Sequence, residues 1–429
     1  MVRASSLIYF MALALPAASL PSPASSPAVS RCAAQMDSSL PYYVPEGFHF
    51  SGNVRKYYVA AEVDAWDYAP SGYDNYLGVR MNESFRAQTW GYIPSNTSMG
   101  TKYDKALYRG YTGADFKTRT EQPPWQGYMG PTIRGEVGDM IEILFVNNME
   151  LFYASMHSMG LFYPKEFEGS IYYNGTGTHP SLGDAVAPGE CFVYKWLVPG
   201  SSASPDPGMN SKLFSYHSYV SMYQDQDAGL SGPIIIYNAG TMESTMAQNR
   251  EFVLFYGDNQ ESNSFLALHN VQKYLPQIAS SFTNESSTYP KLPSGNESVW
   301  YPQLINTPNI PSINTSVAAN FFPMNGYIFS NSPAFEMCVN DKVIWYLWDM
   351  GFDTHTVHWH GDNVLQHGIV TPSVAINPGQ MITVTMNAAN PGWWQVICHF
   401  NQHLSKGMEA NYIVHGGVGN DCTLPPLEK

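Results

Sequence analysis

The sequence predicts an all-β protein built from β-sandwiches with Greek-key connections. Short runs rich in β-branched and aromatic residues, separated by Gly, Pro and Asn, dominate the chain, and sustained helical periodicity is scarce. Such runs occupy residues 56–61, 140–146, 232–237 and 381–386. The length of 429 residues suits about two domains of ordinary size.

An internal repeat supports the division into two domains. Residues 130–139, followed by His157, run parallel to residues 335–341, followed by His358. We therefore expect domain 1 over residues 40–240. Domain 2 is expected over residues 250–418.

The first residues predict export from the cell. A basic residue, an apolar run and a group of small residues within residues 1–19 are typical of a cleaved signal peptide. No later apolar stretch is long enough to span a bilayer, so we expect a secreted, extracellular protein. Six N-glycosylation sequons fit this location: Asn82, Asn96, Asn174, Asn284, Asn296 and Asn314.

Cysteine content and charge narrow the set of partners. Four of the five cysteines, Cys32, Cys191, Cys338 and Cys422, predict two disulfides with three alternative pairings, and Cys32 and Cys422 could instead join subunits. The net charge of −14 with 13% charged residues argues against nucleic acid or an anionic membrane surface as a partner.

Two short stretches near the C-terminus gather the ligands of a blue-copper site. His355 comes early, and Cys398, His403 and Met408 follow in one later loop. Two imidazoles, a thiolate and a weak axial thioether suit both Cu(I) and Cu(II). Taken singly, Cys398 and Met408 are better explained as core residues, but the combined pattern favours copper. In the first half Tyr216 replaces the cysteine, so domain 1 should lack this site.

Strand geometry separates the histidines into two groups. Because side chains alternate along a strand, His358 and His360 share one face while His355 points to the other. By the same parity Cys398 faces the blue-copper site and His399 faces the side of His358, where a second metal could bind. The Cys398–His399 dipeptide then forms a covalent route for an electron.

These ligands, together with four further segments, resemble the multicopper oxidase superfamily. Within it, the chain is similar to the group of ceruloplasmin, hephaestin and the A domains of coagulation factors V and VIII. The resemblance implies two cupredoxin-like domains, equivalent to one of the three repeating pairs in ceruloplasmin, and copper as the cofactor. The segments that carry it are 56–68, 105–112, 229–236 and 407–409.

In that family a trinuclear copper cluster, held by four His-x-His pairs, reduces dioxygen to water. Here Met159, Tyr219 and Ile397 stand at three of the eight histidine positions, which disfavours four-electron reduction. The resemblance assigns His157 and His358 to a type 2 copper, and leaves His217, His399 and His360 as residual type 3 positions, so one or two further ions are expected.

Three functions follow as hypotheses. The first is a copper oxidoreductase of ferroxidase-like type that accepts one electron from a small-molecule or metal-ion reductant. Gln402 stands where ferroxidases of this type carry an aspartate, which weakens the case for iron. The second is a copper carrier or electron-transfer protein, and the third is an extracellular recognition protein of the A-domain type. The family architecture further suggests a head-to-tail homotrimer, in which domain 1 of one chain meets domain 2 of the next.

Overall fold

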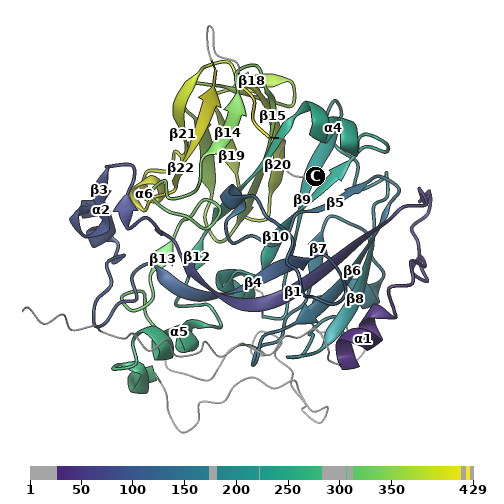
Figure 1. The fold of residues 1–429 in the computed structure, drawn as a ribbon, viewed down its shortest axis with the longest axis horizontal. Coiled ribbons are helices and arrows are strands. Elements are labelled where there is room, and N and C mark those ends of the chain that lie inside the picture. Colours follow the sequence, from purple (N-terminus) through teal and green to yellow (C-terminus); the bar gives the residue numbers. More distant parts are fainter. Residues whose placement is uncertain are drawn as a thin grey trace, which may run out of the picture.

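The molecule is built from two pairs of packed β-sheets, one pair in each half of the chain (Figure 1). The computed structural model describes residues 27–172, 181–221, 223–282, 306, 313–416 and 422–425. The predicted signal peptide and the sequons at Asn174, Asn284 and Asn296 lie outside these residues, whereas Asn82, Asn96 and Asn314 are exposed. The all-β prediction is confirmed.

The first half forms two four-stranded sheets that enclose one apolar core. The strands, in spatial order, are β4 (Lys102–Tyr111), β1 (Val54–Asp67), β6 (Met140–Asn147) and β8 (Cys191–Leu197) in one sheet, and β5 (Ile133–Glu136), β10 (Ser231–Tyr237), β9 (Ser211–His217) and β7 (His157–Met159) in the other.

The second half forms two five-stranded sheets. Their strands, in spatial order, are β11 (Arg250–Gly257), β15 (Lys342–Met350), β20 (Met381–Asn387), β17 (Val364–Gln366) and β18 (Ile369–Thr371) in one sheet, and β14 (Phe335–Cys338), β22 (Glu409–His415), β21 (Gly392–Cys398), β16 (His355–Trp359) and β19 (Ser373–Ile376) in the other.

The repeat seen in the sequence reappears as a repeat of strand pairing. In the first half β1 runs parallel to β6, which pairs antiparallel with β8; in the second half β11, β15 and β20 repeat this arrangement. Likewise β5 and β10 pair in parallel, as do β14 and β22. The domain limits at 40–240 and 250–418 stay a prediction.

Short elements connect the sheets and cover their edges. Helix α4 links β10 to β11, and no helix among the described residues is long and apolar enough to cross a bilayer. The helices are α1 (Pro27–Ala33), α2 (Phe85–Thr89), α3 (Tyr223–Ala228), α4 (Met242–Gln248), α5 (Ala267–Tyr274) and α6 (Asn401–Ser405), with 3₁₀ turns at η2 (Met81–Glu83), η3 (Pro124–Gln126), η4 (Lys165–Phe167) and η5 (Ala279–Phe282). The remaining strands are β2 (Tyr73–Asp74), β3 (Val79–Arg80), β12 (Asn259–Gln260) and β13 (Asn320–Phe321).

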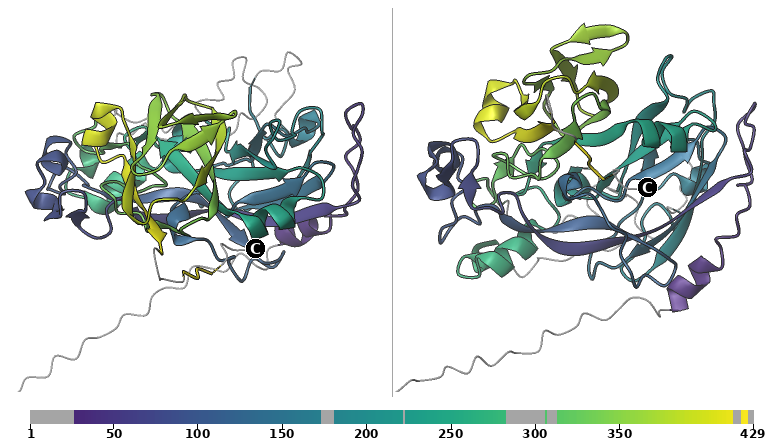
Figure 2. Two further views of the ribbon diagram at one scale, coloured as in Figure 1. Left: turned by 90° about the horizontal axis from the view of Figure 1, so that it is seen from above. Right: turned by 45° about the horizontal axis from the view of Figure 1, so that its top comes forward.

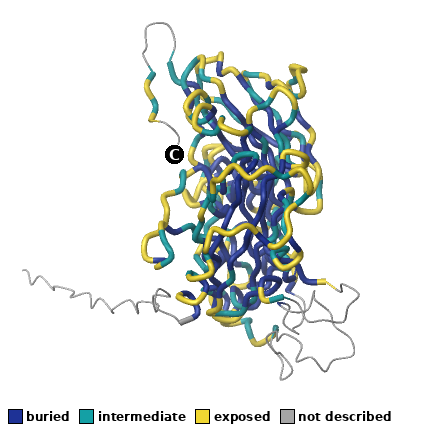
Figure 3. The backbone as a smooth tube through the Cα atoms, turned by 90° about the vertical axis from the view of Figure 1, so that its right-hand side faces the viewer, coloured by how far each residue is buried: buried dark blue, intermediate teal, exposed yellow. Residues whose placement is uncertain are grey.

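The two halves share part of their core. One apolar cluster contains Tyr68 and Trp125 from the first half together with Phe252, Trp345 and other residues of the second half. Figure 3 shows the buried residues in the interior of the molecule and the exposed residues at its periphery. Strand β9 packs beside β15 and β20, where the Tyr346 hydroxyl donates to Ser211 Oγ at 2.7 Å. The two turned views in Figure 2 also show the first half and the second half lying against each other.

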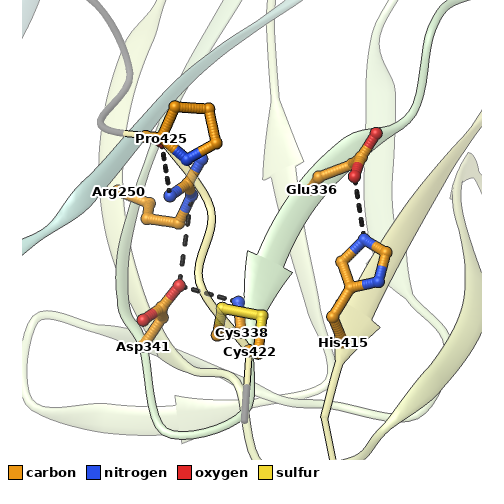
Figure 4. Close-up of a disulfide and its surroundings, with 7 residues drawn as sticks. All are labelled: Arg250, Glu336, Cys338, Asp341, His415, Cys422 and Pro425. Carbon is orange, nitrogen blue, oxygen red and sulfur yellow. Dashed lines mark hydrogen bonds and ion pairs between the residues drawn. A yellow bond between two sulfur atoms is a disulfide. The ribbon is translucent and has the colours of Figure 1, made fainter.

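The structure settles the disulfide pairing that the sequence leaves open. Cys32 bonds to Cys191 and Cys338 bonds to Cys422, so each bridge lies within one half and neither joins subunits. The first holds α1 against the outer face of β6 and β8, which explains why β6 is buried on both faces. The second ties the C-terminal segment to β14, beside the contact between Arg250 and Asp341 (Figure 4).

Candidate metal centre

Three of the predicted ligands come together in a buried pocket of the second half. Cys398 Sγ lies 3.6 Å from both His355 Nδ1 and His403 Nδ1, and the two Nδ1 atoms are 3.1 Å apart. All three side chains are buried. One ion bonded at about 2.0–2.3 Å to each donor, as in imidazole and thiolate metal sites, requires donor separations of this size. The residues present therefore fit a copper ion.

Local structure explains how these ligands converge. His355 is the first residue of β16, Cys398 is the last of β21, and these strands are hydrogen-bonded neighbours. The chain then forms the single turn of α6, which carries His403. Met408 follows directly and is buried; its backbone carbonyl accepts from the Cys398 N–H at 3.1 Å.

Gly407 allows the chain to pass close to the core just before Met408. Its φ is +95°, and a Cβ atom there would lie 2.5 Å from Phe329 Cδ1. A side chain at this position would force the ligand loop away from Phe329, so glycine is required for the loop geometry.

Carboxylates surround the outer nitrogens of both copper-facing histidines. His403 Nε2 lies 3.1 Å from Asp353 Oδ2, and His355 Nε2 lies 3.5 Å from both Asp258 Oδ1 and Asp349 Oδ1. Groups of this kind fix the orientation of a ligating imidazole. Both rings consequently present Nδ1 to the thiol.

The local charges favour a thiolate. Burial alone would raise the pKa of Cys398, but hydrogen bonds to His355 and His403 outweigh burial and lower it to about 6. Burial would likewise lower the pKa of His355, but the two carboxylates and Cys398 raise it to about 11. In the metal-free protein a thiolate thus balances a positive imidazole, and a metal ion can take the place of the proton.

Aromatic rings shield the pocket from water. Phe322 stacks on His403 with ring centroids 4.2 Å apart, and Phe400 lies 4.5 Å from the same ring. Tyr256 lies 5.3 Å from the ring of His355. The His403–Asp353 pair forms the partly exposed side of the centre, since the Asp353 side chain is 34% exposed.

The other histidines predicted to bind metal gather in two groups outside the pocket. His358 lies 5.2 Å from His360 and 5.6 Å from His399, measured between ring centroids. In the first half, His157 faces His217 across β7 and β9 at 5.4 Å. The burial pattern of β16 alternates, with His355 buried and His358 less so, which confirms the predicted separation of faces.

Three of these outer histidines use their ring nitrogens in the opposite way to the histidines of the pocket. His157, His217 and His358 each place Nδ1 within 2.7–2.8 Å of a backbone carbonyl oxygen. Nδ1 therefore carries the proton, and Nε2 keeps a free lone pair that can bind a metal. Burial lowers the pKa of His157. Burial and the neighbouring His157 together lower the pKa of His217 to about 4, so both imidazoles are neutral at pH 7.

Two substituted positions are filled by packing. Tyr216, at the position of the missing cysteine, is fully buried and donates to the Pro131 carbonyl at 2.8 Å. Ile397 is buried opposite His358 in the pairing of β16 with β21. Tyr219, by contrast, keeps its ring 5.5 Å from His157 and 5.6 Å from His217.

Sequence reasoning missed the charged residues around the centre. Asp353 could have been noticed because it lies two residues before His355. Asp258 directly follows the end of β11 and is far from the copper ligands in the sequence. Arg86 is equally distant: it donates to the Leu404 carbonyl at 3.1 Å and pairs with Asp74 and Glu409. Helix α2 thereby lies beside α6 (Figure 1).

Comparison with known proteins identifies the family. Two models described as multicopper oxidase match residues 124–241 and 304–417, together more than half of the chain. The chain is 30% identical over 372 residues to mouse (Mus musculus) "Ferroxidase HEPHL1", 28% identical over 382 residues to Homo sapiens hephaestin and 28% identical over 366 residues to Homo sapiens ceruloplasmin. These matches cover 84–87% of this chain but only 30–31% of the curated relatives.

Solved structures support the fold. A copper nitrite reductase from Nitrosomonas europaea matches with a TM-score of 0.50 and 14% identity, covering 85% of this chain and 94% of that one. The multicopper oxidase mgLAC matches equally, with a TM-score of 0.50, 14% identity and coverage of 84% and 86%. The predicted cupredoxin-like sandwiches are thus confirmed, as is copper as the metal of the family. This chain belongs to the multicopper oxidase superfamily.

Proposed function

We propose that this chain is a secreted, ferroxidase-like multicopper oxidase that takes one electron from an external reductant at a type 1 copper. The ligands are His355, Cys398, His403 and Met408. The observation that carries the proposal is the buried triangle of two Nδ1 atoms and one Sγ, with donor separations of 3.1–3.6 Å. Because carboxylates hold both outer nitrogens, the donors are oriented before metal binds.

Copper bound to this donor set would alternate between Cu(II) and Cu(I). The protein keeps water out through Phe322 and Phe400, which pack on His403. The reductant reaches the partly exposed His403–Asp353 pair. A carboxylate at this edge attracts a hard cation such as Fe(II). Asp353 thereby supplies part of the negative charge that is missing because position 402 is glutamine rather than aspartate.

The second half offers a connection from the thiol to the outer histidines. Cys398 and His399 are adjacent, and His399 lies 5.6 Å from His358 between ring centroids. His157 and His358 are the proposed type 2 ligands, and His217, His399 and His360 occupy the residual type 3 positions. Their free Nε2 atoms, where Nδ1 donates to a backbone carbonyl, support one or two further ions.

Assembly would unite the two histidine groups. Within the described part of this chain no ring contact joins the group around His157 to the group around His358. A head-to-tail homotrimer would bring domain 1 of one chain against domain 2 of the next and place the groups together. Sedimentation equilibrium of the copper-loaded protein measures this; a single monomeric species would exclude the trimer.

A second candidate function is one-electron transfer or copper carriage without oxidase activity. It is favoured by Ile397, whose apolar side chain is buried opposite His358 at a position where the family has histidine. Under this alternative the type 1 centre is intact but dioxygen is not consumed.

One experiment separates the two functions. The copper content of the purified secreted chain is counted, and the type 1 absorption band is followed in a stopped-flow instrument after mixing with Fe(II), first without and then with dioxygen. The ferroxidase-like function predicts bleaching by Fe(II) and recovery with oxygen uptake; bleaching without recovery favours electron transfer. Cys398→Ser is the control that lacks the band. Failure of Fe(II) and of an aromatic amine to bleach it would refute both.

A further inference from the structure

A second group of potential ligands lies directly behind the copper-facing histidine. Asp258, Asp349 and His355 each offer one donor atom, and these three atoms lie within 4.8 Å of one another. All three side chains are completely buried. Because His355 turns Nδ1 toward Cys398, only Nε2 faces the two carboxylates.

Orienting the imidazole of His355 needs only one carboxylate. Two buried carboxylate oxygens nevertheless lie equally far from Nε2, at 3.5 Å, which is beyond normal hydrogen-bond length. Among the described residues, neither oxygen of Asp349 has a hydrogen-bond partner, and the same holds for Asp258 Oδ1 and His355 Nε2. One imidazole cannot balance two buried carboxylates, so a further proton or a cation is expected between them.

The geometry suits a cation better than a proton. Ligand bonds of about 2.0–2.2 Å arranged tetrahedrally place donor atoms about 3.4 Å apart, close to the two measured separations. In the described part of the chain, neither carboxylate has a lysine or arginine ion-pair partner that would already neutralise it.

The surrounding backbone holds the carboxylates in position. Asp258 Oδ2 accepts from the backbone N–H groups of Phe352 and Asp353 at 2.9 and 2.7 Å, which leaves Oδ1 directed to His355. Asp349 is fixed on β15 by backbone hydrogen bonds with Gly379 and Gln380. Gly351 permits this approach, since a Cβ atom there would lie 2.4 Å from Asp258.

We infer that Asp258, Asp349 and His355 Nε2 form a second cation site, back to back with the copper ligands through one imidazole ring. Two carboxylates and one imidazole select a zinc-type divalent ion over Ca²⁺ or Mg²⁺, which prefer all-oxygen sites. On binding, the Nε2–H bond breaks, the proton passes to solvent and the nitrogen–metal bond forms, so one proton is released per ion.

The site is tested with Co²⁺ as the probe, added to the copper-loaded full chain. We expect one Co²⁺ bound in addition to that bound at the outer histidines, and broadening of the type 1 Cu(II) paramagnetic signal because the two ions share a ring. Zn²⁺, which is diamagnetic, should bind without broadening. Calorimetry in buffers of different ionisation enthalpy should show release of one proton.

Asp349→Asn is the decisive variant, because asparagine keeps the shape and removes one anionic ligand. It should weaken Co²⁺ binding at this site at least about tenfold while the type 1 absorption persists. The matched control is Asp341→Asn, which alters a carboxylate just before β15, at the end opposite Asp349, and should leave Co²⁺ uptake unchanged. Ions at the outer histidines bind equally to the wild type and to both variants, so they cancel in the comparison.

Two results would overturn the inference. The first is wild-type protein that, with an intact type 1 signal, takes up no more Co²⁺ than Asp349→Asn; a buried proton then neutralises the pair. The second is an equal loss of Co²⁺ binding in Asp341→Asn. If Asp349→Asn does not fold, the absence of signal broadening in the wild type decides alone. None of these results bears on oxygen uptake, so the proposed oxidase function stands or falls separately.

Discussion

Replacing Arg86 by methionine should destabilise the protein and loosen the copper-ligand loop. Its guanidinium is 6% exposed and lies between the fully buried carboxylates of Asp74 and Glu409, at 2.6 and 2.8 Å. Methionine keeps much of the side-chain length but removes the charge. Both carboxylates are then buried without their partner, and the Leu404 carbonyl loses a donor.

The magnitude follows from the burial. Removing one partner of a buried ion pair costs about 3–5 kcal/mol, which is a large part of the 5–15 kcal/mol that stabilises a typical domain. Taking up a proton limits the cost: burial already raises the pKa of Glu409 to about 7 even though Arg86 lowers it. We therefore expect a loss of about 3–5 kcal/mol at pH 7 that becomes smaller at pH 5, where Glu409 is protonated more easily.

The assay is urea unfolding of the metal-free chain, followed by tryptophan fluorescence at pH 7 and pH 5, with paramagnetic spectra of the copper-loaded forms. The matched control is Arg31→Met, because Arg31 pairs with Glu190 at the same 2.8 Å but is 60% exposed. Exposed pairs contribute about 0–1 kcal/mol. Glu409→Gln added to Arg86→Met should recover part of the loss. Equal effects of the two arginine variants, or an unchanged copper spectrum in Arg86→Met, would refute the reasoning.

Three further outcomes are expected. Cys398→Ser should abolish the intense absorption and narrow copper hyperfine splitting of a type 1 centre while circular dichroism stays that of a β-protein; persistent colour would contradict the ligand assignment. Metal-free protein should lose about 3 kcal/mol of stability as pH falls from 6.5 toward 4, because buried His217 has its pKa lowered to about 4 and is protonated more readily when unfolded. Urea unfolding should show this loss in the wild type and not in His217→Gln. Asp353→Asn should raise the type 1 reduction potential and slow Fe(II) oxidation about tenfold, measured by voltammetry and stopped flow; an unchanged rate would exclude Asp353 from iron recognition.

The sequence predicted those parts of the site that depend on local geometry. Strand alternation places His355 and Cys398 on one face and His358 and His399 on the other, and the structure has them so. The protonated ring nitrogen of each histidine could not be predicted, because it depends on partners such as the Glu168 and Pro372 carbonyls.

Long-range contacts account for what the sequence left open. Four cysteines allow three pairings, and only the folded sheets bring Cys32 to Cys191, 159 residues away. Arg86 reaches a carbonyl 318 residues later in the chain. Asp258 and Asp349 become neighbours because β11 and β15 pair in parallel. No periodic pattern along the chain predicts that these residues become neighbours in the fold.

The shared apolar cluster restricts how this protein can be dissected. Tyr68 and Trp125 belong to an apolar cluster that also contains Phe252 and Trp345. A fragment starting at β11 would therefore expose aromatic side chains to water, and it would lack the hydrogen bond from Arg86 to the Leu404 carbonyl in α6. Such a fragment would tend to aggregate, although it contains every type 1 ligand. Recombinant truncation, or swapping of single halves between relatives, is therefore expected to yield insoluble material, whereas a break elsewhere, in an exposed connecting segment, is better tolerated.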